Sequence, residues 1–144
     1  MIEIEDSVLV SQPRSAVFRF AARPENMPLW NPVVHESRVE GRLGAGATVV
    51  QAASLLGRRF ETVYTVTRYE PGRRIVYTST RGPMDIRGTM EFRSERGGTL
   101  IRWVVCGDCR GFLRAAEGVI LGAGRREMHA CLANLKRLLD AQAA

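Results

Sequence analysis

Two closely spaced cysteines near the end of the chain are the first candidates for chemistry. Cys106 and Cys109 are separated by Gly-Asp, and His129 and Cys131 follow later. Two thiolates at this spacing can chelate zinc, and a thiol at a helix start can become acidic enough for redox chemistry. The second pair has the wrong spacing for a zinc ribbon, and the βαβ context of redox CxxC motifs is absent. We therefore expect packed thiols without a metal or cofactor, although the sequence leaves a function of Cys106 and Cys109 open.

His35 and two tyrosines are further candidates, because they are polar residues on strands whose apolar side chains share one face. Val33 and Val39 mark the covered face of one predicted strand, and the strand period of two places His35 on the same side. Tyr64 and Tyr77 combine an apolar ring with a hydroxyl that usually finds a partner when buried. A histidine there could donate a hydrogen bond or act as a weak base, and the tyrosines could contact a ligand oxygen.

No established catalytic signature accompanies these residues. The sequence has no nucleophile elbow with an ordered Ser/His/Asp set, no glycine-rich phosphate loop that opens a helix, and no HExxH motif. Whether the protein is an enzyme is therefore left open by its sequence.

The segment from residue 33 to residue 108 has the pattern of a sheet with one covered face. Turn signals at 41–46, 57, 71–72, 82–83 and 97–98 divide it into six strands. Within these strands apolar residues alternate with polar or charged ones, as expected where one face is wet and the other is covered. The predicted covered face includes Phe60, Tyr64, Val66, Ile75, Tyr77, Ile86, Met90, Phe92, Ile101, Trp103 and Val105.

The two ends of the chain complete this sheet. Residues 2–11 alternate and predict a first strand, and Pro13 opens a short apolar helix that contains Val17 and Phe18. After Arg110 the apolar period changes to about 3.6 residues, which predicts one long amphipathic helix. This helix must cover the apolar face of the sheet.

Three glycines interrupt the long predicted helix. Gly118, Gly122 and Gly124 each cost about 1 kcal/mol relative to alanine in a regular helix. We therefore expect a kink or break near residues 117–125, with the bend, the hairpin at Gly57 and the loop at 82–84 forming the mouth of a cavity. The alternative is that the glycines only let an unbroken helix pack closely on the sheet.

Length and composition are those of an ordinary globular protein. The chain has 144 residues, 45% hydrophobic and 25% charged, so we expect one domain over residues 1–144. The net charge is +6, but the arginines gather on no predicted helix face, so we expect no nucleic-acid partner. A secretory signal, a bilayer-spanning apolar run and a disulfide framework are all missing. These features favour the cytoplasm without stable membrane insertion, and they leave a homodimer open.

The order of predicted elements is specific, and local motifs follow the same order. They are residues 27–32 (MPLWNP), 44–47 (GAGA), 66–77 (VTRYEPGRRIVY), 97–103 (GGTLIRW) and 132–139 (LANLKRLL). Over essentially the whole chain they resemble the START/Bet v 1-like (SRPBCC) superfamily, and particularly its bacterial polyketide cyclase/dehydrase-like branch. The resemblance implies an α+β helix-grip fold, with a seven-stranded curved antiparallel sheet, two short helices after the first strand and a long C-terminal helix.

A strongly curved sheet cannot contact a straight helix along its whole length, so we expect a gap between them. An empty gap of roughly 300 Å³ would cost about 7 kcal/mol, which approaches the stability of a whole domain. The gap must therefore be wet, narrowed by large side chains, or occupied by an apolar guest. The residues expected to contact such a guest are His35, Phe60, Tyr64, Tyr77, Met90, Phe92, Trp103, Leu121 and Met128.

We expect the protein to bind a small hydrophobic ligand, such as a lipid, isoprenoid or polyketide, for transport or sequestration. The resemblance also permits an aromatase/cyclase-type enzyme, in which a tyrosine, His35 or an arginine near the mouth moves a proton or polarises a carbonyl. A polar group with a perturbed pKa deep in the cavity would favour the enzyme, and an all-apolar cavity would favour binding alone. A large exposed apolar patch without a cavity would favour a protein-interaction domain.

Overall fold

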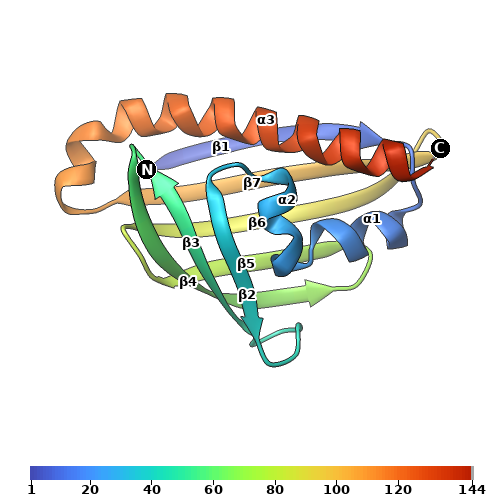
Figure 1. Cartoon of the computed structure of the whole chain (residues 1–144), viewed down its shortest axis with the longest axis horizontal. Helices are drawn as coiled ribbons and strands as arrows, with labels where there is room; N and C mark the ends of the chain where they lie inside the picture. The colour runs from blue at the N-terminus through green and yellow to red at the C-terminus, as the bar shows by residue number, and fades with distance from the viewer. Residues whose placement is uncertain (144) are drawn as a thin grey trace.

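The computed structural model describes residues 1–143, apart from the side chains of Phe112 and Ala143. The turn signals read from the sequence fall between its strands, except that Gly98 already begins the last strand, and two short helices follow the first strand as expected (Figure 1). The elements are β1 (Ile2–Val10), α1 (Arg14–Ala21), the 3-10 helix η1 (Pro24–Asn26), α2 (Met27–Trp30), β2 (Val34–Glu40), β3 (Thr48–Leu55), β4 (Arg58–Glu70), β5 (Arg74–Arg81), β6 (Met84–Glu95), β7 (Gly98–Cys109), the 3-10 helix η2 (Gly111–Ala116) and α3 (Glu117–Ala143).

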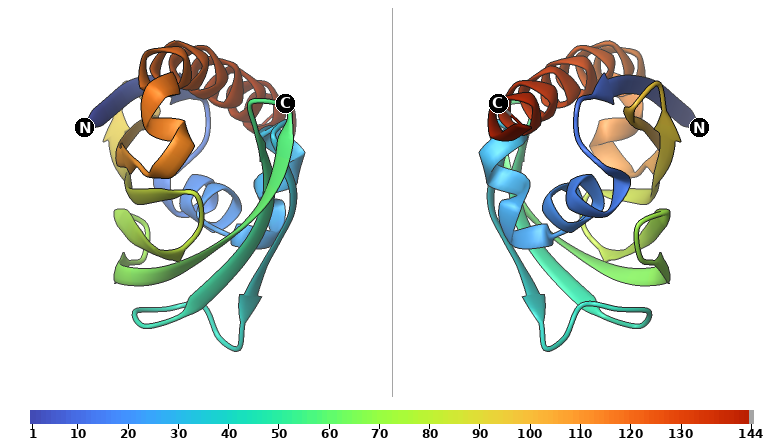
Figure 2. Two further views of the ribbon diagram at one scale, coloured as in Figure 1. Left: turned by 90° about the vertical axis from the view of Figure 1, so that its left-hand side faces the viewer. Right: turned by 90° about the vertical axis from the view of Figure 1, so that its right-hand side faces the viewer.

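The strands form one antiparallel sheet in the order β1-β7-β6-β5-β4-β3-β2. The first strand forms one edge of the sheet and lies beside the last strand, with Val8 opposite Ile101. The sheet is strongly curved, and in the end-on views α3 lies across the opening of the trough while α1 and α2 lie at its concave side (Figure 2). The helix-grip fold class predicted from the sequence is confirmed.

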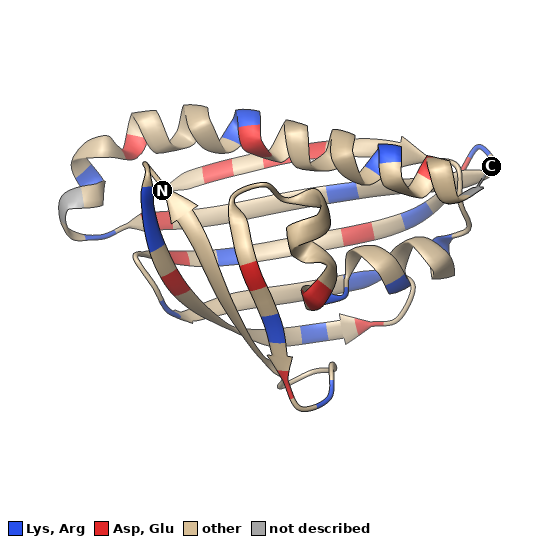
Figure 3. Ribbon diagram, in the orientation of Figure 1, with Lys and Arg blue, Asp and Glu red and all other residues tan. Residues whose placement is uncertain are grey.

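The two faces of the sheet differ in chemistry as the alternation predicts. Val66, Ile75 and Met90 are buried on the concave face. On the convex face, Glu91 accepts hydrogen bonds of 2.7 Å from both Arg74 and Arg102, and Arg102 also donates to Glu5 at 2.8 Å. Basic and acidic residues are interleaved along the strands (Figure 3). Ion pairs on a solvated sheet face therefore account for several of the scattered arginines.

The long helix begins later than expected and is unbroken. Residues Gly111–Ala116 form η2, and α3 then runs without interruption from Glu117. The kink or break predicted near residues 117–125 is therefore not found at the glycines: the change from a 3-10 helix to an α-helix lies before them, between Ala116 and Glu117. A Cβ at Gly124 would lie 2.5 Å from Cδ1 of Ile4, so this glycine lets α3 approach β1 closely, whereas a Cβ at Gly118 would meet open space. Like the other described helices, α3 is not long and apolar enough to cross a membrane.

Candidate functional site

A cavity of about 230 Å³ lies between the sheet, the corner around α2, and α3. Its lining is mostly apolar, with a few amide, phenol and carboxyl groups. The sheet contributes Val34, Val49, Gln51, Ala53, Tyr64, Val66, Ile75, Tyr77, Ile86, Met90, Trp103 and Val105; the corner contributes Ala21, Ala22, Pro24, Met27, Asn31 and Val33; and α3 contributes Glu127.

The cavity lies toward the helical corner. The hairpin at Gly57 and the turn at Gly82–Pro83, which we expected at its mouth, contribute no lining residue. Helix α3 also runs without a break through its glycines. The helical corner between α1 and β2 contributes lining residues instead.

Small residues keep this part of the interior from being filled. Ala21 and Ala22 at the end of α1 and Ala53 on β3 present only a methyl group to the cavity. On β6, Gly88 is paired with Tyr77 of β5, and a Cβ at Gly88 would lie 2.0 Å from Cζ of Tyr77. The Tyr77 ring therefore occupies the place that a side chain at position 88 would take.

Four aromatic side chains form a continuous wall from β4 to α2. The rings of Tyr64 and Tyr77 meet edge to face with centroids 5.2 Å apart, and Trp103 and Trp30 meet in the same way at 5.5 Å. The indole Nε1 of Trp103 donates to Oη of Tyr77 at 2.9 Å, which joins the two pairs. The two tyrosines and Trp103 line the cavity, whereas Trp30 locks α2 onto this wall.

Both cavity tyrosines keep their phenolic protons. Burial raises the pKa of Tyr64 to about 12, and burial together with the neighbouring Tyr64 raises the pKa of Tyr77 further above its ordinary value. Because Tyr77 accepts its hydrogen bond from Trp103, its own proton remains available for donation. The sheet side of the cavity, where Tyr64 and Tyr77 lie, thus offers hydroxyl donors at neutral pH.

Two amide side chains connect the helical corner to the sheet. Nε2 of Gln51 on β3 donates to the sulfur of Met27 at 3.4 Å and to Oγ of Ser37 at 3.5 Å. The side-chain Oδ1 of Asn31 accepts from the backbone N–H of Val33 at 3.2 Å. These contacts explain how two buried amides are tolerated beside an apolar cavity.

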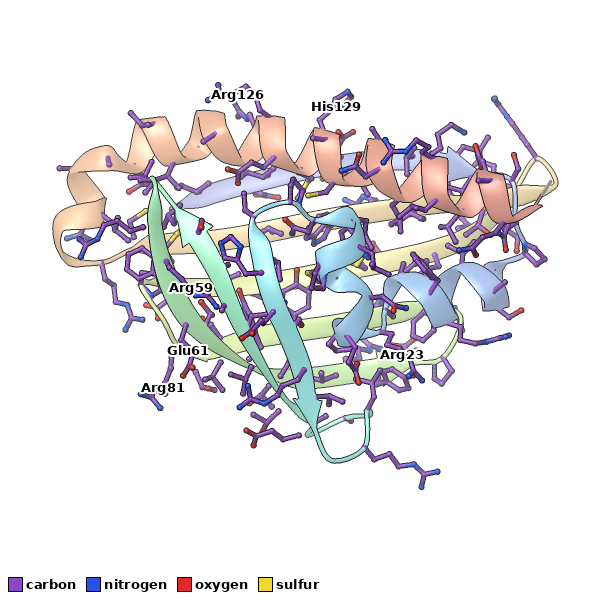
Figure 4. The ribbon with its side chains drawn as sticks, viewed as in Figure 1. Arg23, Arg59, Glu61, Arg81, Arg126 and His129 are labelled. Atoms are coloured by element: carbon purple, nitrogen blue, oxygen red, sulfur yellow. The ribbon has the colours of Figure 1, made fainter. Side chains whose placement is uncertain are left out.

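Glu127 is the charged residue among those that line the cavity, and it was not among the residues expected there. It is half-buried on α3, and burial raises the pKa of its carboxyl, with a smaller opposing effect from Arg126. Arg126 and His129 point away from the sheet (Figure 4). Glu127 lies three residues after Gly124 and four before the buried Cys131, so the helical period itself placed this carboxyl on the inward face.

The expected orientation of His35 is wrong, and a β-bulge is the reason. Val34 pairs with Ala53 and Glu36 pairs with Ala52, so His35 is the extra residue between them. The bulge reverses the alternation: Val34 lines the cavity, while His35 is exposed with Nε2 at 2.6 Å from Oγ of Ser54.

Of the residues expected to contact a guest, Tyr64, Tyr77, Met90 and Trp103 line the cavity. A contact between any of these side chains and a ligand stays a prediction. The remaining five lie elsewhere in the fold.

Those five belong to the surrounding structure. Phe92 packs edge to face on Phe18, with centroids 5.2 Å apart, and Met128 is buried in the core. Phe60 is half-buried near the β3–β4 hairpin, where it contacts the guanidinium of Arg58. Leu121 packs against the core from α3. His35 and these four residues do not line the cavity.

The Cys106 and Cys109 pair is not arranged for chelation. The strand β7 continues through both residues, and a separation of three places their side chains on opposite faces of the sheet. Cys109 is buried, Cys106 is half-buried, and both are free. Burial raises the pKa of Cys131 to about 12. Among the described side chains, no cluster of His, Cys, Asp and Glu could hold a metal ion.

Comparison with known proteins connects this geometry to a family. Residues 1–140 match the family described as polyketide cyclase/dehydrase and lipid transport. A search among curated proteins finds no match.

Solved structures share the fold at low sequence identity. The protein TTHA0849 from Thermus thermophilus is similar with a TM-score of 0.85 and 18% identity, over 99% of each chain. A START superfamily protein from Mycobacterium smegmatis gives a TM-score of 0.76 at 12% identity, over 94% of this chain and 98% of that one. Ara h 8.0201 gives 0.70 at 14% identity, over 95% and 96%. At these identities the likeness concerns the fold.

Proposed function

The chain belongs to the polyketide cyclase/dehydrase and lipid transport family, and from this premise we propose that it binds a small hydrophobic molecule between its sheet and α3. The observation that carries the proposal is the cavity of about 230 Å³ with its largely apolar lining. A cavity of about 150 Å³ can hold benzene. A molecule of one or two rings, or an isoprenoid of similar size, therefore fits this space better than a two-chain lipid.

An apolar space that water does not fill is costly. At about 24 cal/mol per Å³, a dry space of 230 Å³ would cost about 5.5 kcal/mol. That is a large part of the net stability of a small domain. Burial of an apolar guest returns about 25 cal/mol for each Å² removed from water, and the polar groups in the wall set its orientation. The ligand would be held for transport or sequestration.

The binding test compares two alanines on the same strand. Ala53 lines the cavity, and Ala52 belongs to the opposite face of β3. Ala53→Leu fills the cavity, so it should abolish the thermal stabilisation that wild type gains from naphthalene-sized alcohols and monoterpenes. Ala52→Leu is the matched control and should retain the response. A panel of such ligands that stabilises neither wild type nor Ala52→Leu contradicts the proposal.

An enzyme of the aromatase/cyclase kind is the second candidate, and Glu127 is the observation that favours it. A carboxyl with a raised pKa opposite phenolic donors is a suitable set for proton transfer during an aldol closure. The test is the cyclisation of a linear triketone, in which a carbon–carbon bond forms and water is lost, followed by absorbance. Acceleration by wild type and its loss in Glu127→Gln supports the enzyme. Binding without acceleration supports a carrier.

A further inference from the structure

Glu127 sits where the inward face of α3 otherwise presents small or apolar side chains. Its neighbours on that face are Gly124, Met128 and Cys131, of which the last two are buried. Glu127 lines the cavity from α3, opposite the sheet. An acid that served only solubility would be expected on the outward face of α3, where Arg126, one residue before Glu127, lies exposed.

The other half-buried acids have partners, which makes Glu127 different. Glu91 is held by Arg74 and Arg102, and Asp140 accepts from the backbone N–H of Ser11 at 2.8 Å. No such hydrogen bond or ion pair to Glu127 is present among the residues that the structure describes. A carboxyl beside an apolar space without a donor carries a desolvation cost that a ligand can relieve.

The chemistry of the wall restricts which ligand can do this. An ionised carboxylate only accepts hydrogen bonds, so the group that meets Glu127 must carry a donor. An ammonium or hydroxyl satisfies this requirement, whereas a ligand carboxylate would place two like charges in a site of low dielectric. From the sheet, Tyr64 and Tyr77 line the cavity with apolar rings and with hydroxyls that keep their protons.

We propose that the cavity takes a small apolar molecule with an amine or hydroxyl at one end, that Glu127 binds this donor, and that apolar acids are excluded. This inference rests on the proposed function, because it specifies the ligand class of the same cavity. Glu127 then acts as the residue that determines specificity, while the aromatic wall supplies most of the buried area.

Three probes with the same two fused rings test this inference. Naphthylmethylamine, naphthalenemethanol and naphthoic acid differ only in the polar end, and their affinities can be measured by calorimetry at pH 7. Loss of a charge-assisted hydrogen bond changes affinity by about tenfold to a hundredfold. We expect wild type to bind the amine and the alcohol at least about tenfold more tightly than the acid.

Glu127→Gln should remove this discrimination with little change in shape. We expect it to weaken the amine about tenfold or more and to strengthen the acid, so that the preference largely disappears. Glu61→Gln is the matched control, because Glu61 is an exposed acid on the other face of β4, and it should leave all three affinities unchanged (Figure 4).

The outcomes separate the two proposals. Equal binding of the acid and the amine by wild type, unaffected by Glu127→Gln but lost in Ala53→Leu, overturns the role of Glu127 and leaves the cavity as a binding site. Absence of binding of all three probes to wild type, with Ala53→Leu behaving in the same way, overturns the proposed function and this inference together. Discrimination in wild type that Glu127→Gln removes and Glu61→Gln retains supports both.

Discussion

The concave side of the sheet contains two regions that differ in how completely side chains fill them. Under α1, Phe18 packs edge to face on both Phe92 and Tyr69, with centroids 5.2 and 5.5 Å apart. In the cavity region, Ala53 and the Tyr64–Tyr77 pair surround about 230 Å³ of space. One sheet and one long helix therefore enclose both a packed core and a cavity.

The difference shows that curvature alone does not create the cavity. In the packed region a helix inserts a phenylalanine into the trough, whereas in the cavity region the same chain places alanines at the end of α1 and on β3. Polar groups follow the same division, since Gln51, Tyr77 and Glu127 all line the cavity. Close aromatic packing is concentrated in one region, and the groups that can recognise a ligand are concentrated in the other.

The sharpest test of this division compares two residues on the same face of β6. Phe92→Ala leaves a hole in the packed region. It should lower the free energy of unfolding by about 3–5 kcal/mol, because closely packed neighbours such as Phe18 cannot move to fill the hole. Ile86→Ala only enlarges an existing cavity and should cost less than half as much. Urea unfolding measures both. Equal costs would show that the two regions do not differ energetically.

The next test removes the space that Tyr77 uses. Gly88→Ala places a Cβ 2.0 Å from Cζ of Tyr77, so the ring and its hydrogen bond with Trp103 must be displaced. We expect a loss of about 2–3 kcal/mol by urea unfolding, from overpacking and an unpaired indole N–H. In a Tyr77→Ala background the same substitution should be much less costly, because the ring is gone. A cost that is unchanged in that background would place the strain in the β6 backbone instead.

Most of the architecture was predictable because it depends on patterns that the chain repeats. The alternation of apolar and polar residues, with the glycine and proline turns, predicted six strands correctly. The same alternation correctly predicted that Met90 and Trp103 are buried on the concave face. The long helix followed from its apolar period. Its glycines were misinterpreted, because the sequence does not show that Gly124 faces Ile4 of β1.

The candidate site was only partly predictable, for two physical reasons. A β-bulge at His35 shifts the strand alternation by one residue, and the local sequence there has no glycine to signal it. Glu127 was missed because the inward stripe of the helix was traced through apolar residues alone. Its spacing of four from Cys131 is a signal that could have identified it.

A substitution on α3 beside the cavity is expected to stabilise the protein slightly, in contrast to the destabilising substitutions on β6. Gly122 lies inside α3, and a Cβ there would meet only the guanidinium of Arg126 at an ordinary distance of 3.6 Å. Gly122→Ala should therefore raise the free energy of unfolding by about 0.5–1 kcal/mol through helix propensity. Thermal and urea unfolding measure it. A destabilisation would mean that flexibility of this turn, rather than close packing, is what the fold uses.

The smallest expected effect concerns the stability cost of Glu127. Burial raises the pKa of this carboxyl above its ordinary 4.5, so the folded state favours its protonated form more than the unfolded state does. The contribution of Glu127 to the free energy of unfolding is therefore fully present below pH 4.5, and it is lost as the pH rises through the pKa of the folded state. Glu127→Gln should therefore be more stable than wild type at pH 8, by a few tenths of a kcal/mol after screening at a half-exposed group. The difference should vanish below pH 4.5.

Urea titrations of both proteins without ligand, at the two pH values, measure this difference, with Glu61→Gln as the exposed control. A lower stability of Glu127→Gln at pH 8 would mean that the carboxylate has a stabilising partner within the fold. If Glu127→Gln is instead more stable at pH 8 and no longer discriminates among the naphthyl probes, then Glu127 contributes to ligand recognition and lowers the stability of the fold. That result would agree with the contrast between the packed region and the cavity region.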